Sequence, residues 1–540
     1  MYEKEDLVDQ LLEHNSARRK RQKKLDIRVI MGNPPYSAGQ ENANDNNQNI
    51  DYPNLDSRIR STYAERSTAT NKNALYDSYI RAIRWASDRI GSSGVIGFVT
   101  NAGWVEANTG DGLRKCLADE FSTLYVFHLR GNARTSGELR RKEKDNVFGM
   151  GSRAPIAISL LVKNPTAKEH GKIHFHDIGD YLGREEKLEK IESYASIAGI
   201  TKAGGWQPVI PDAHGDWLKQ RDDSFNDFMA LGDKTGKGVT TLLSNFSRGL
   251  ETGRDAWCYN SSQKAVMDNM VSMITFYNSE VQRFNAARTG LDKKAREEAV
   301  DSFINTNPAQ ISWTSSLKQE LVRDKLFSYK ADSLAYSLYR PFTKQWCYYN
   351  GTFNHRVGQM PRIFPNMAVE NRVICVSGIG ARSGFSALMA DTLPCLDNIE
   401  KGQCFPLYLY EPVVPAQAGT QATLDLAEAK PLDSRLRGND GNGRGRGNDG
   451  DVRGDGEYVH GNDGYMRGND GYARRDAITD EGLAHFQSAY PGEAISKEDV
   501  FYYVYGLLHS KDYRERYADN LSKELPRIPR VKTAAGFRTF

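Results

Sequence analysis

The first third of the chain alternates short apolar runs with amphipathic stretches. The apolar runs predict strands, and because their apolar content is continuous rather than alternating, they favour burial on both faces of a parallel sheet. Between residues 73 and 94 the apolar side chains recur at helical spacing up to Gly91, which marks a helix end. Strands that alternate with helices predict a doubly wound α/β sheet. The predicted strands are residues 25–30, 95–104, 123–129 and 154–163, and the predicted helices are residues 73–94 and 111–121.

A second pattern begins near residue 165, where apolar and polar positions mix and aromatic side chains become more frequent. Residues 262–306 have helical spacing, whereas residues 336–350 and 371–390 favour sheet and loop. Residues 495–528 are again strongly helical, and their apolar face predicts that this segment packs back onto the same domain. We therefore expect a separate, mixed α/β domain after the first sheet.

Residues 413–475 differ from everything around them, because they are rich in glycine and repeat the motif RGNDG. A calcium-binding repeat would need a strict nine-residue period, and the motif does not keep one. A segment this poor in large apolar side chains cannot offset the entropy of ordering it. It also resembles a translated intergenic repeat. We expect a disordered insertion in a surface loop, and thus four parts: residues 1–164, 165–412, 413–475 and 476–540.

The composition limits which class of protein this can be, but it does not identify a binding partner. The 540 residues carry 72 Lys and Arg against 69 Asp and Glu, and this balance does not by itself indicate nucleic-acid binding. A short helix is expected at residues 4–14, followed at 16–24 by a basic run that is either a solvated connector or a phosphate contact. No apolar run is long enough to cross a bilayer and no signal-peptide core is present, so we expect a cytoplasmic protein without membrane contact. The six cysteines have no zinc-type spacing, and no metal is expected.

The tetrapeptide Asn33-Pro34-Pro35-Tyr36 follows directly after the first predicted strand. Such a turn can activate an amine whose lone pair is delocalised into a ring. The Asn33 side-chain oxygen and the Pro34 carbonyl would accept hydrogen bonds from the two N–H groups, and prolines hold these acceptors in place. Tyr36 can stack on a target base that has been flipped out of a duplex. This chemistry predicts methyl transfer to an amino group, and by itself it admits adenine N6, cytosine N4 or a protein glutamine amide.

Longer stretches resemble one known family. The segments IRVIMGNPPYS, GVIGFVTNAGW, FSRGLETGRDAW, YRPFTKQWCYYN and KEDVFYYVYGLLHSKDYRERYADN resemble the methyltransferase and specificity parts of type ISP restriction–modification enzymes. The resemblance covers most of the chain except residues 413–475. It implies a site-specific DNA N6-adenine methyltransferase that uses S-adenosylmethionine and acts on double-stranded DNA. The implied fold is a partial Rossmann-like class I methyltransferase sheet in residues 1–164, followed by a mixed α/β target-recognition domain. Protein-glutamine methyltransferases are much smaller and lack such a downstream domain.

The chain departs from this family at the methyl-donor site. The family uses a glycine-rich turn upstream of the catalytic motif, and no such turn precedes Asn33 here. Leu75 and Tyr76 match a helix that borders the donor's adenine pocket, and core packing is the alternative role for both. In this fold the catalytic strand lies beside the first strand, so residues 25–30 are expected to form a bare sheet edge. We expect a fragment that needs an upstream-encoded part carrying the remaining methyltransferase, nuclease and helicase-like segments.

Two groups of polar residues are candidates for DNA contacts. Residues 129–144 form a basic loop that the resemblance places near the active face, and residues 246–257 lie in the expected recognition domain. Basic side chains could bind phosphates, and arginine also suits guanine edges, whereas solvated surface is the alternative role. The candidates are Arg134, Arg140, Arg141, Lys142, Arg248, Arg254 and Trp257.

Two further functions stay open from the sequence. The chain could be a DNA-binding specificity module that does no chemistry, in which case it would bind DNA in a salt-sensitive way without binding the donor. It could also be a decayed remnant, which the inserted repeat and the missing donor turn favour.

Overall fold

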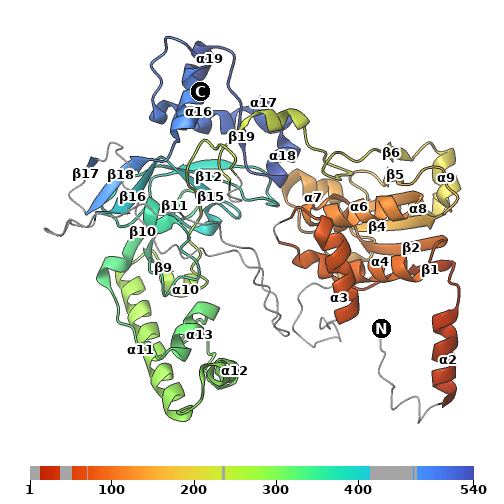
Figure 1. The fold of residues 1–540 in the computed structure, drawn as a ribbon, viewed down its shortest axis with the longest axis horizontal. Coiled ribbons are helices and arrows are strands. Elements are labelled where there is room, and N and C mark those ends of the chain that lie inside the picture. The colour runs from red at the N-terminus through yellow and green to blue at the C-terminus, as the bar shows by residue number, and fades with distance from the viewer. Residues whose placement is uncertain (1–12, 37–51, 70, 234–237, 414–465, 468–470) are drawn as a thin grey trace, which may run out of the picture. The chain divides into compact units, whose positions relative to one another are not determined.

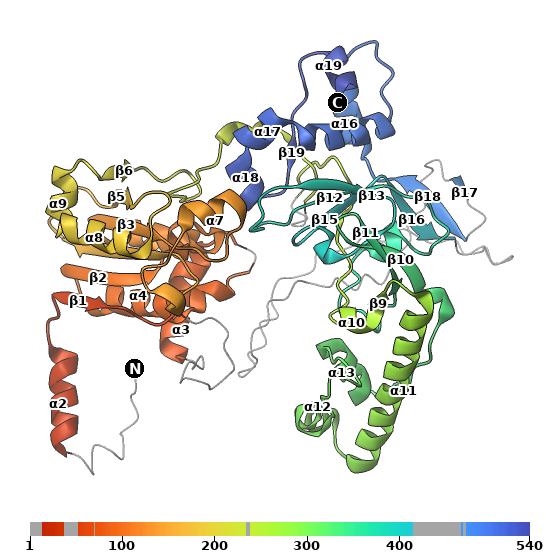
Figure 2. The ribbon, with the colours of Figure 1, turned by 180° about the vertical axis from the view of Figure 1, so that it is seen from behind.

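The computed structural model describes the chain except for residues 1–12, 37–51, 70, 234–237, 414–465 and 468–470 (Figures 1 and 2). The described residues fall into two compact units, which span residues 1–222 and 223–540. The mixed α/β class expected from the sequence is confirmed. The first unit extends well past residue 164, where the sequence pattern placed the domain boundary.

The first unit contains a mixed six-stranded sheet with the strand order β1-β2-β4-β3-β5-β6. β1 is parallel to β2, and β4 runs antiparallel to both of its neighbours, β2 and β3. β5 is parallel to β3, and the short β6 closes the far edge. Residues 165–222 therefore belong to this sheet and not to the recognition domain. The strands are β1 (Val29–Gly32), β2 (Gly94–Asn101), β3 (Thr123–Arg130), β4 (Ile156–Lys163), β5 (Lys172–Asp177) and β6 (Gln207–Val209).

Helices of the first unit pack their apolar stripes against this sheet. α4 (Ser78–Arg89) begins later than the sequence pattern predicts, because Asp77 caps it by accepting a hydrogen bond from the Tyr79 amide. Its predicted stripe is buried in one core with Ile96 and Phe98 of β2. The basic run at residues 16–24 is helical and forms part of α2 (Glu13–Lys24), and whether it is a connector or a phosphate contact stays open. The others are α3 (Pro53–Ile59), α5 (Gly103–Glu106), α6 (Asp111–Glu120), α7 (Gly137–Glu143), α8 (Arg184–Tyr194) and α9 (Ile197–Lys202), with a π-helix at Arg60–Ala64 and a 3-10 helix at Asn73–Tyr76.

The second unit is built from small antiparallel and mixed sheets around one apolar core. The strand orders are β14-β10-β11-β9, β13-β12-β15-β8, β16-β18-β17 and β19-β7. The strands are β7 (Met229–Ala230), β8 (Ser247–Arg248), β9 (Tyr259–Asn260), β10 (Leu334–Arg340), β11 (Thr343–Tyr348), β12 (Val373–Val376), β13 (Ala387–Ala390), β14 (Leu393–Pro394), β15 (Gln403–Pro406), β16 (Tyr408–Pro412), β17 (Met466–Arg467), β18 (Tyr472–Asp476) and β19 (Arg527–Ile528).

The predicted helix at residues 262–306 is two helices, joined by a turn in which Gly290 adopts a positive φ of +85° and Asp292 caps the second helix by accepting from the Ala295 amide. Their bounds are α11 (Gln263–Ala287) and α12 (Lys293–Phe303). The remaining helices are α10 (Asp255–Cys258), α13 (Ser315–Val322), α14 (Met360–Ile363), α15 (Asp480–Gln487), α16 (Lys497–His509), α17 (Lys511–Arg516), α18 (Ala518–Lys523) and α19 (Ala534–Thr539).

The C-terminal segment packs back onto the second unit, as predicted. One buried cluster runs from Phe225 to Phe537 and includes the apolar face of α16. β18 pairs antiparallel with β16, so Pro412 lies opposite Tyr472. The predicted insertion lies mostly outside the described residues, and the two strands that flank it are neighbours. Paired flanks of this kind allow a surface loop to vary in length at small cost.

No described helix is long and apolar enough to cross a membrane. Among the described residues, no three His, Cys, Asp or Glu side chains gather as a metal site would require. All six cysteines are unbridged and buried.

Candidate active site and DNA-contact residues

The tetrapeptide Asn33–Tyr36 leaves the carboxyl end of β1, beside the parallel strand β2. Open α/β sheets bind their ligands at this end of parallel strands, because the loops there converge. Asn33 and Pro35 are exposed, whereas Pro34 and Tyr36 are partly buried. The asparagine amide is thus presented to solvent on a turn that the prolines stiffen.

The Tyr36 hydroxyl donates a hydrogen bond to Asn33 Oδ1 at 3.0 Å and lies 3.5 Å from the Val99 carbonyl oxygen in β2. The Tyr36 ring packs edge-on against Tyr79 of α4, with ring centroids 6.0 Å apart. Burial raises the pKa of Tyr36 to about 12, so the hydroxyl stays protonated and keeps donating. An amide oxygen has two lone pairs, and the second is left for another donor. Tyr36 therefore fixes the orientation of the Asn33 amide.

Leu75 and Tyr76, the two candidates for the methyl-donor site, have different environments. Leu75 lies in the 3-10 helix Asn73–Tyr76 and is fully buried in the core of the first unit, so its side chain has the packing role. Tyr76 is only partly buried. Of these two candidates for the methyl-donor site, only Tyr76 keeps a partly exposed side chain that a ligand could contact.

The basic loop after β3 folds into α7 and makes ion pairs on the surface. Arg141 pairs with Glu138 at 2.5 Å, and Lys142 lies 3.5 Å from Asp180. Arg140 donates to the Lys144 carbonyl, and Arg134 is exposed. Exposed pairs of this kind contribute little stability, so phosphate oxygens could replace the carboxylates.

Tyr181 also belongs to this surface, although the sequence pattern did not identify it. Tyr181 is half exposed, adopts a positive φ of +62° and donates from its hydroxyl to Glu138 at 2.6 Å. With Arg140, Arg141, Lys144 and Asp145 it lines a shallow cavity of about 420 Å³. Tyr181 is distant from the loop in sequence, and only the pairing of β5 with β3 brings it here. A period-two pattern in KIHFHD was the available signal for that strand.

The three candidates in the second unit also differ. Arg248 of β8 is partly buried and lies 3.3 Å from Glu251, and Trp257 of α10 packs partly against the core. Arg254 is only 3% exposed and donates to the Phe353 carbonyl at 2.6 Å and to Thr314 Oγ1 at 2.9 Å. The expectation that Arg254 contacts DNA is wrong for this conformation, because its guanidinium holds two interior segments together.

Comparison with known proteins places the chain in a family. Residues 241–540 match the type ISP C-terminal specificity domain, and residues 2–134 match the Eco57I restriction–modification methylase. No protein in the curated set matches the chain.

Solved structures agree with these matches. A nuclease-deletion mutant of the type ISP restriction–modification enzyme LlaGI, in complex with a DNA substrate mimic, is 36% identical with a TM-score of 0.74. The match covers 98% of this chain and 42% of that one. The ATP-dependent type ISP enzyme LlaBIII bound to DNA is 34% identical with a TM-score of 0.75, over 99% of this chain and 30% of that one. The DrdV–DNA complex is 33% identical with a TM-score of 0.73, over 96% and 44%.

These matches define a restriction–modification protein with a methylase sheet and a DNA-specificity domain. The chain belongs to the type ISP restriction–modification enzyme family. It spans less than half the length of each of these solved relatives.

Proposed function

We propose that this chain carries the target-recognition domain and the amine-activating half of a site-specific DNA N6-adenine methyltransferase acting in the cytoplasm. The observation that carries the proposal is the Asn33–Tyr36 turn at the carboxyl end of β1, where the Tyr36 hydroxyl orients the Asn33 amide. Support for DNA as the substrate comes from relatives that were solved with DNA.

In the proposed reaction, this chain's residues hold and activate the amine. The second lone pair of Asn33 Oδ1 and the Pro34 carbonyl accept the two N–H groups, which localises the nitrogen lone pair. The basic residues Arg134, Arg140, Arg141 and Lys142, which are exposed or partly exposed, contact phosphates and fix the register of the duplex. S-adenosylmethionine supplies the electrophilic methyl group when bound. The described residues do not build its site, so no transfer step is assigned to them.

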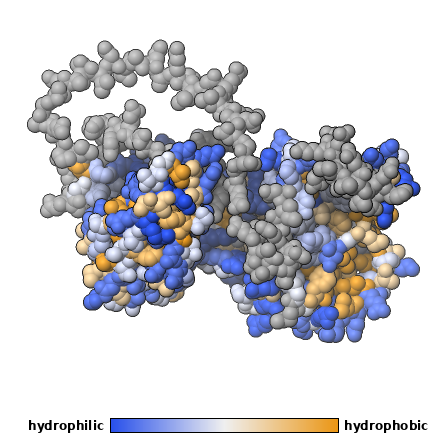
Figure 3. All heavy atoms as spheres, turned by 90° about the horizontal axis from the view of Figure 1, so that it is seen from below, coloured by the Kyte–Doolittle hydropathy of each residue, from blue (hydrophilic) through white to orange (hydrophobic). Residues whose placement is uncertain are grey.

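We further propose that the open side of β1 binds a further strand of a methyltransferase domain, beyond those that the structure describes. Within the described residues β1 pairs only with β2, yet it exposes 62% of Val29 and 80% of Met31. These two side chains share one face of the strand. Figure 3 shows hydrophobic residues gathered on the surface at the right of the view. An apolar edge of this kind is suited to strand addition.

A specificity module without catalysis is the second candidate function, and the match of residues 241–540 to a specificity domain favours it. The test mixes the purified chain with a polypeptide carrying the upstream methyltransferase part, labelled S-adenosylmethionine and duplex DNA. Labelling of adenine N6 only in the mixture supports the methyltransferase. DNA binding without labelling in the complete mixture supports the module instead.

A further inference from the structure

The turn between β10 and β11 holds a large apolar side chain where the backbone favours glycine. Arg340 lies opposite Thr343, so Pro341 and Phe342 are the two corners of the hairpin. Proline at the first corner and a positive φ at the second are the features of a type II turn, which normally has glycine at the second corner. Phe342 has a φ of +60° and is 89% exposed, so it gains almost no packing in return for this strain. Strained residues without a packing role point to function.

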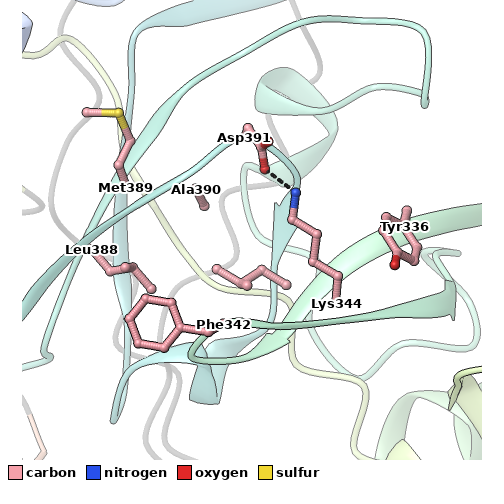
Figure 4. Close-up of a pocket in the computed structure, with 8 residues that line it drawn as sticks. Tyr336, Phe342, Lys344, Leu388, Met389, Ala390 and Asp391 are labelled. Carbon is pink, nitrogen blue, oxygen red and sulfur yellow. Dashed lines mark hydrogen bonds and ion pairs between the residues drawn. The ribbon is translucent and has the colours of Figure 1, made fainter.

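The surface beside Phe342 is hollow and mainly apolar. Figure 4 shows the Phe342 ring and Leu388 on one side of a cavity, with Lys344 and Asp391 joined across another side. The cavity measures about 460 Å³, and the buried side chains Leu338 and Ala390 form part of its wall. A mainly apolar hollow with a few polar groups suits a planar ring that also carries hydrogen-bonding atoms.

The charges around the hairpin favour an anionic partner. Lys344 pairs with Asp391 at 2.7 Å, and Arg372 acts electrostatically on the same carboxylate. Arg340 stacks on the Tyr339 ring at 3.9 Å and lies 3.6 Å from Asp255. Lys344 and Asp391 line the cavity together with the Phe342 ring, and Arg340 lies two residues before this ring in the hairpin. An aromatic ring flanked by positive charge is the combination that nucleic-acid-binding proteins use to stack on bases while holding the backbone.

We propose that Phe342 stacks on a nucleobase of bound DNA, with the cavity between β10, β11 and β13 receiving the edge of that base. This inference rests on the proposed function for its partner, and it adds a contact to the recognition domain that no predicted DNA-contact residue supplies. An apolar side chain inserted against a base step unstacks it, which makes neighbouring thymines reactive toward permanganate.

The test measures binding of the full chain to labelled duplexes of randomised sequence, with Phe342→Ala, Phe342→Trp and Phe342→Gly. Loss of one stacked base should weaken binding by roughly five- to a hundredfold in the alanine and glycine variants, whereas tryptophan should retain it. The slope of affinity against salt should stay the same, because no phosphate contact is lost. Permanganate reactivity in the complex should disappear with the ring.

In the glycine variant, the thermal stability and the DNA affinity should change in different ways. Glycine adopts a positive φ without a steric clash, so Phe342→Gly should leave the midpoint of thermal unfolding unchanged or higher while binding falls. Leu326→Ala, at another exposed apolar side chain of the same unit, is the matched control and should bind normally. Equal DNA affinity in wild type and Phe342→Ala overturns the inference and leaves the proposed function standing. A loss confined to binding of the upstream polypeptide also overturns it, and absence of DNA binding by the wild type overturns both.

Discussion

The two units complete their cores to different extents. In the second unit a single buried cluster runs from Phe225 to Phe537 and includes residues on both sides of the inserted segment. In the first unit the sheet ends at β1, whose other side has no neighbour within the part of the chain that the structure describes. Leu25, Val29 and Met31 are all more than half exposed there. The second unit should therefore fold without a partner, whereas the first unit offers an apolar edge to one.

This difference separates two properties that one enzyme normally combines. Under the proposed function, DNA recognition would depend on the closed core of the second unit and should persist in the isolated chain. Amine activation would depend on the turn at the open edge of the first unit, and it would become methyl transfer only when a donor site is added. The comparison is tested by variants that affect one unit and leave the other unchanged.

The largest expected effect is on folding of the first unit alone. Arg114 of α6 and Asp216 form an ion pair at 2.7 Å with exposures of 0% and 1%. Asp216→Ala would remove the carboxylate paired with this buried guanidinium and leave it only its hydrogen bonds to backbone carbonyls. Removing one partner of a buried ion pair costs about 3–5 kcal/mol. Urea unfolding should show the transition of the first unit shifted to lower urea and that of the second unit unchanged.

Lys264→Ala, which removes an exposed pair with Asp268 in the second unit, is the control and should leave both transitions in place. A shift of the second transition by Asp216→Ala would contradict the finding that residues 165–222 belong to the first unit.

Asn33→Ala should have the next largest effect, on chemistry alone. Removing one preorganised hydrogen-bond partner of a reacting group typically lowers the catalytic rate by about 10²–10³-fold. Methyl transfer by the chain mixed with its upstream partner should fall by that amount, while DNA affinity stays at the wild-type value. Normal methylation with the alanine in place would remove Asn33 from the mechanism.

The sequence predicts the part of the fold that depends on side-chain pattern. β2, β4 and α6 appear close to where their apolar runs and helical spacing placed them, and the tetrapeptide lies at a strand end as expected. The boundary at 164 was wrong because β5 alternates histidines with apolar residues and so lacks a continuous apolar run. Histidine 176 is nonetheless largely buried, with its Nδ1 2.7 Å from the Gly205 carbonyl oxygen.

The sites were harder to predict, because exposure depends on tertiary packing. Arg254 looks like a surface residue in the motif SRGLETGRDAW, yet it is bonded in the interior. The sequence pattern did not single out Phe342 at all. Only the backbone φ and the exposure of its ring distinguish it.

Met31→Lys tests the open edge of the first unit. Its side chain is already exposed, so the isolated chain should be as stable as wild type. Binding of the upstream polypeptide should weaken by roughly ten- to a hundredfold, because burial of one methionine side chain contributes about 1.5–3 kcal/mol. Ile210→Lys, which adds the same charge just after β6 at the opposite edge of the sheet, should not affect this binding. Equal loss in both variants would mean a general effect of charge.

The smallest effect is expected for Tyr36→Phe, which keeps the ring and removes only the hydroxyl that orients Asn33. One hydrogen bond contributes about 0.5–1.5 kcal/mol net, so methyl transfer should fall roughly two- to tenfold. The pKa of Tyr36 is raised by burial to about 12, and the donor is lost only above that value. The pH profiles of wild type and variant should therefore run parallel from about pH 6 to about pH 10. Tyr79→Phe is the control, because it removes a hydroxyl from the ring that packs on Tyr36 and leaves the bond to Asn33 in place. Profiles that diverge within this range would show that Tyr36 takes part in proton transfer instead of orienting the amide.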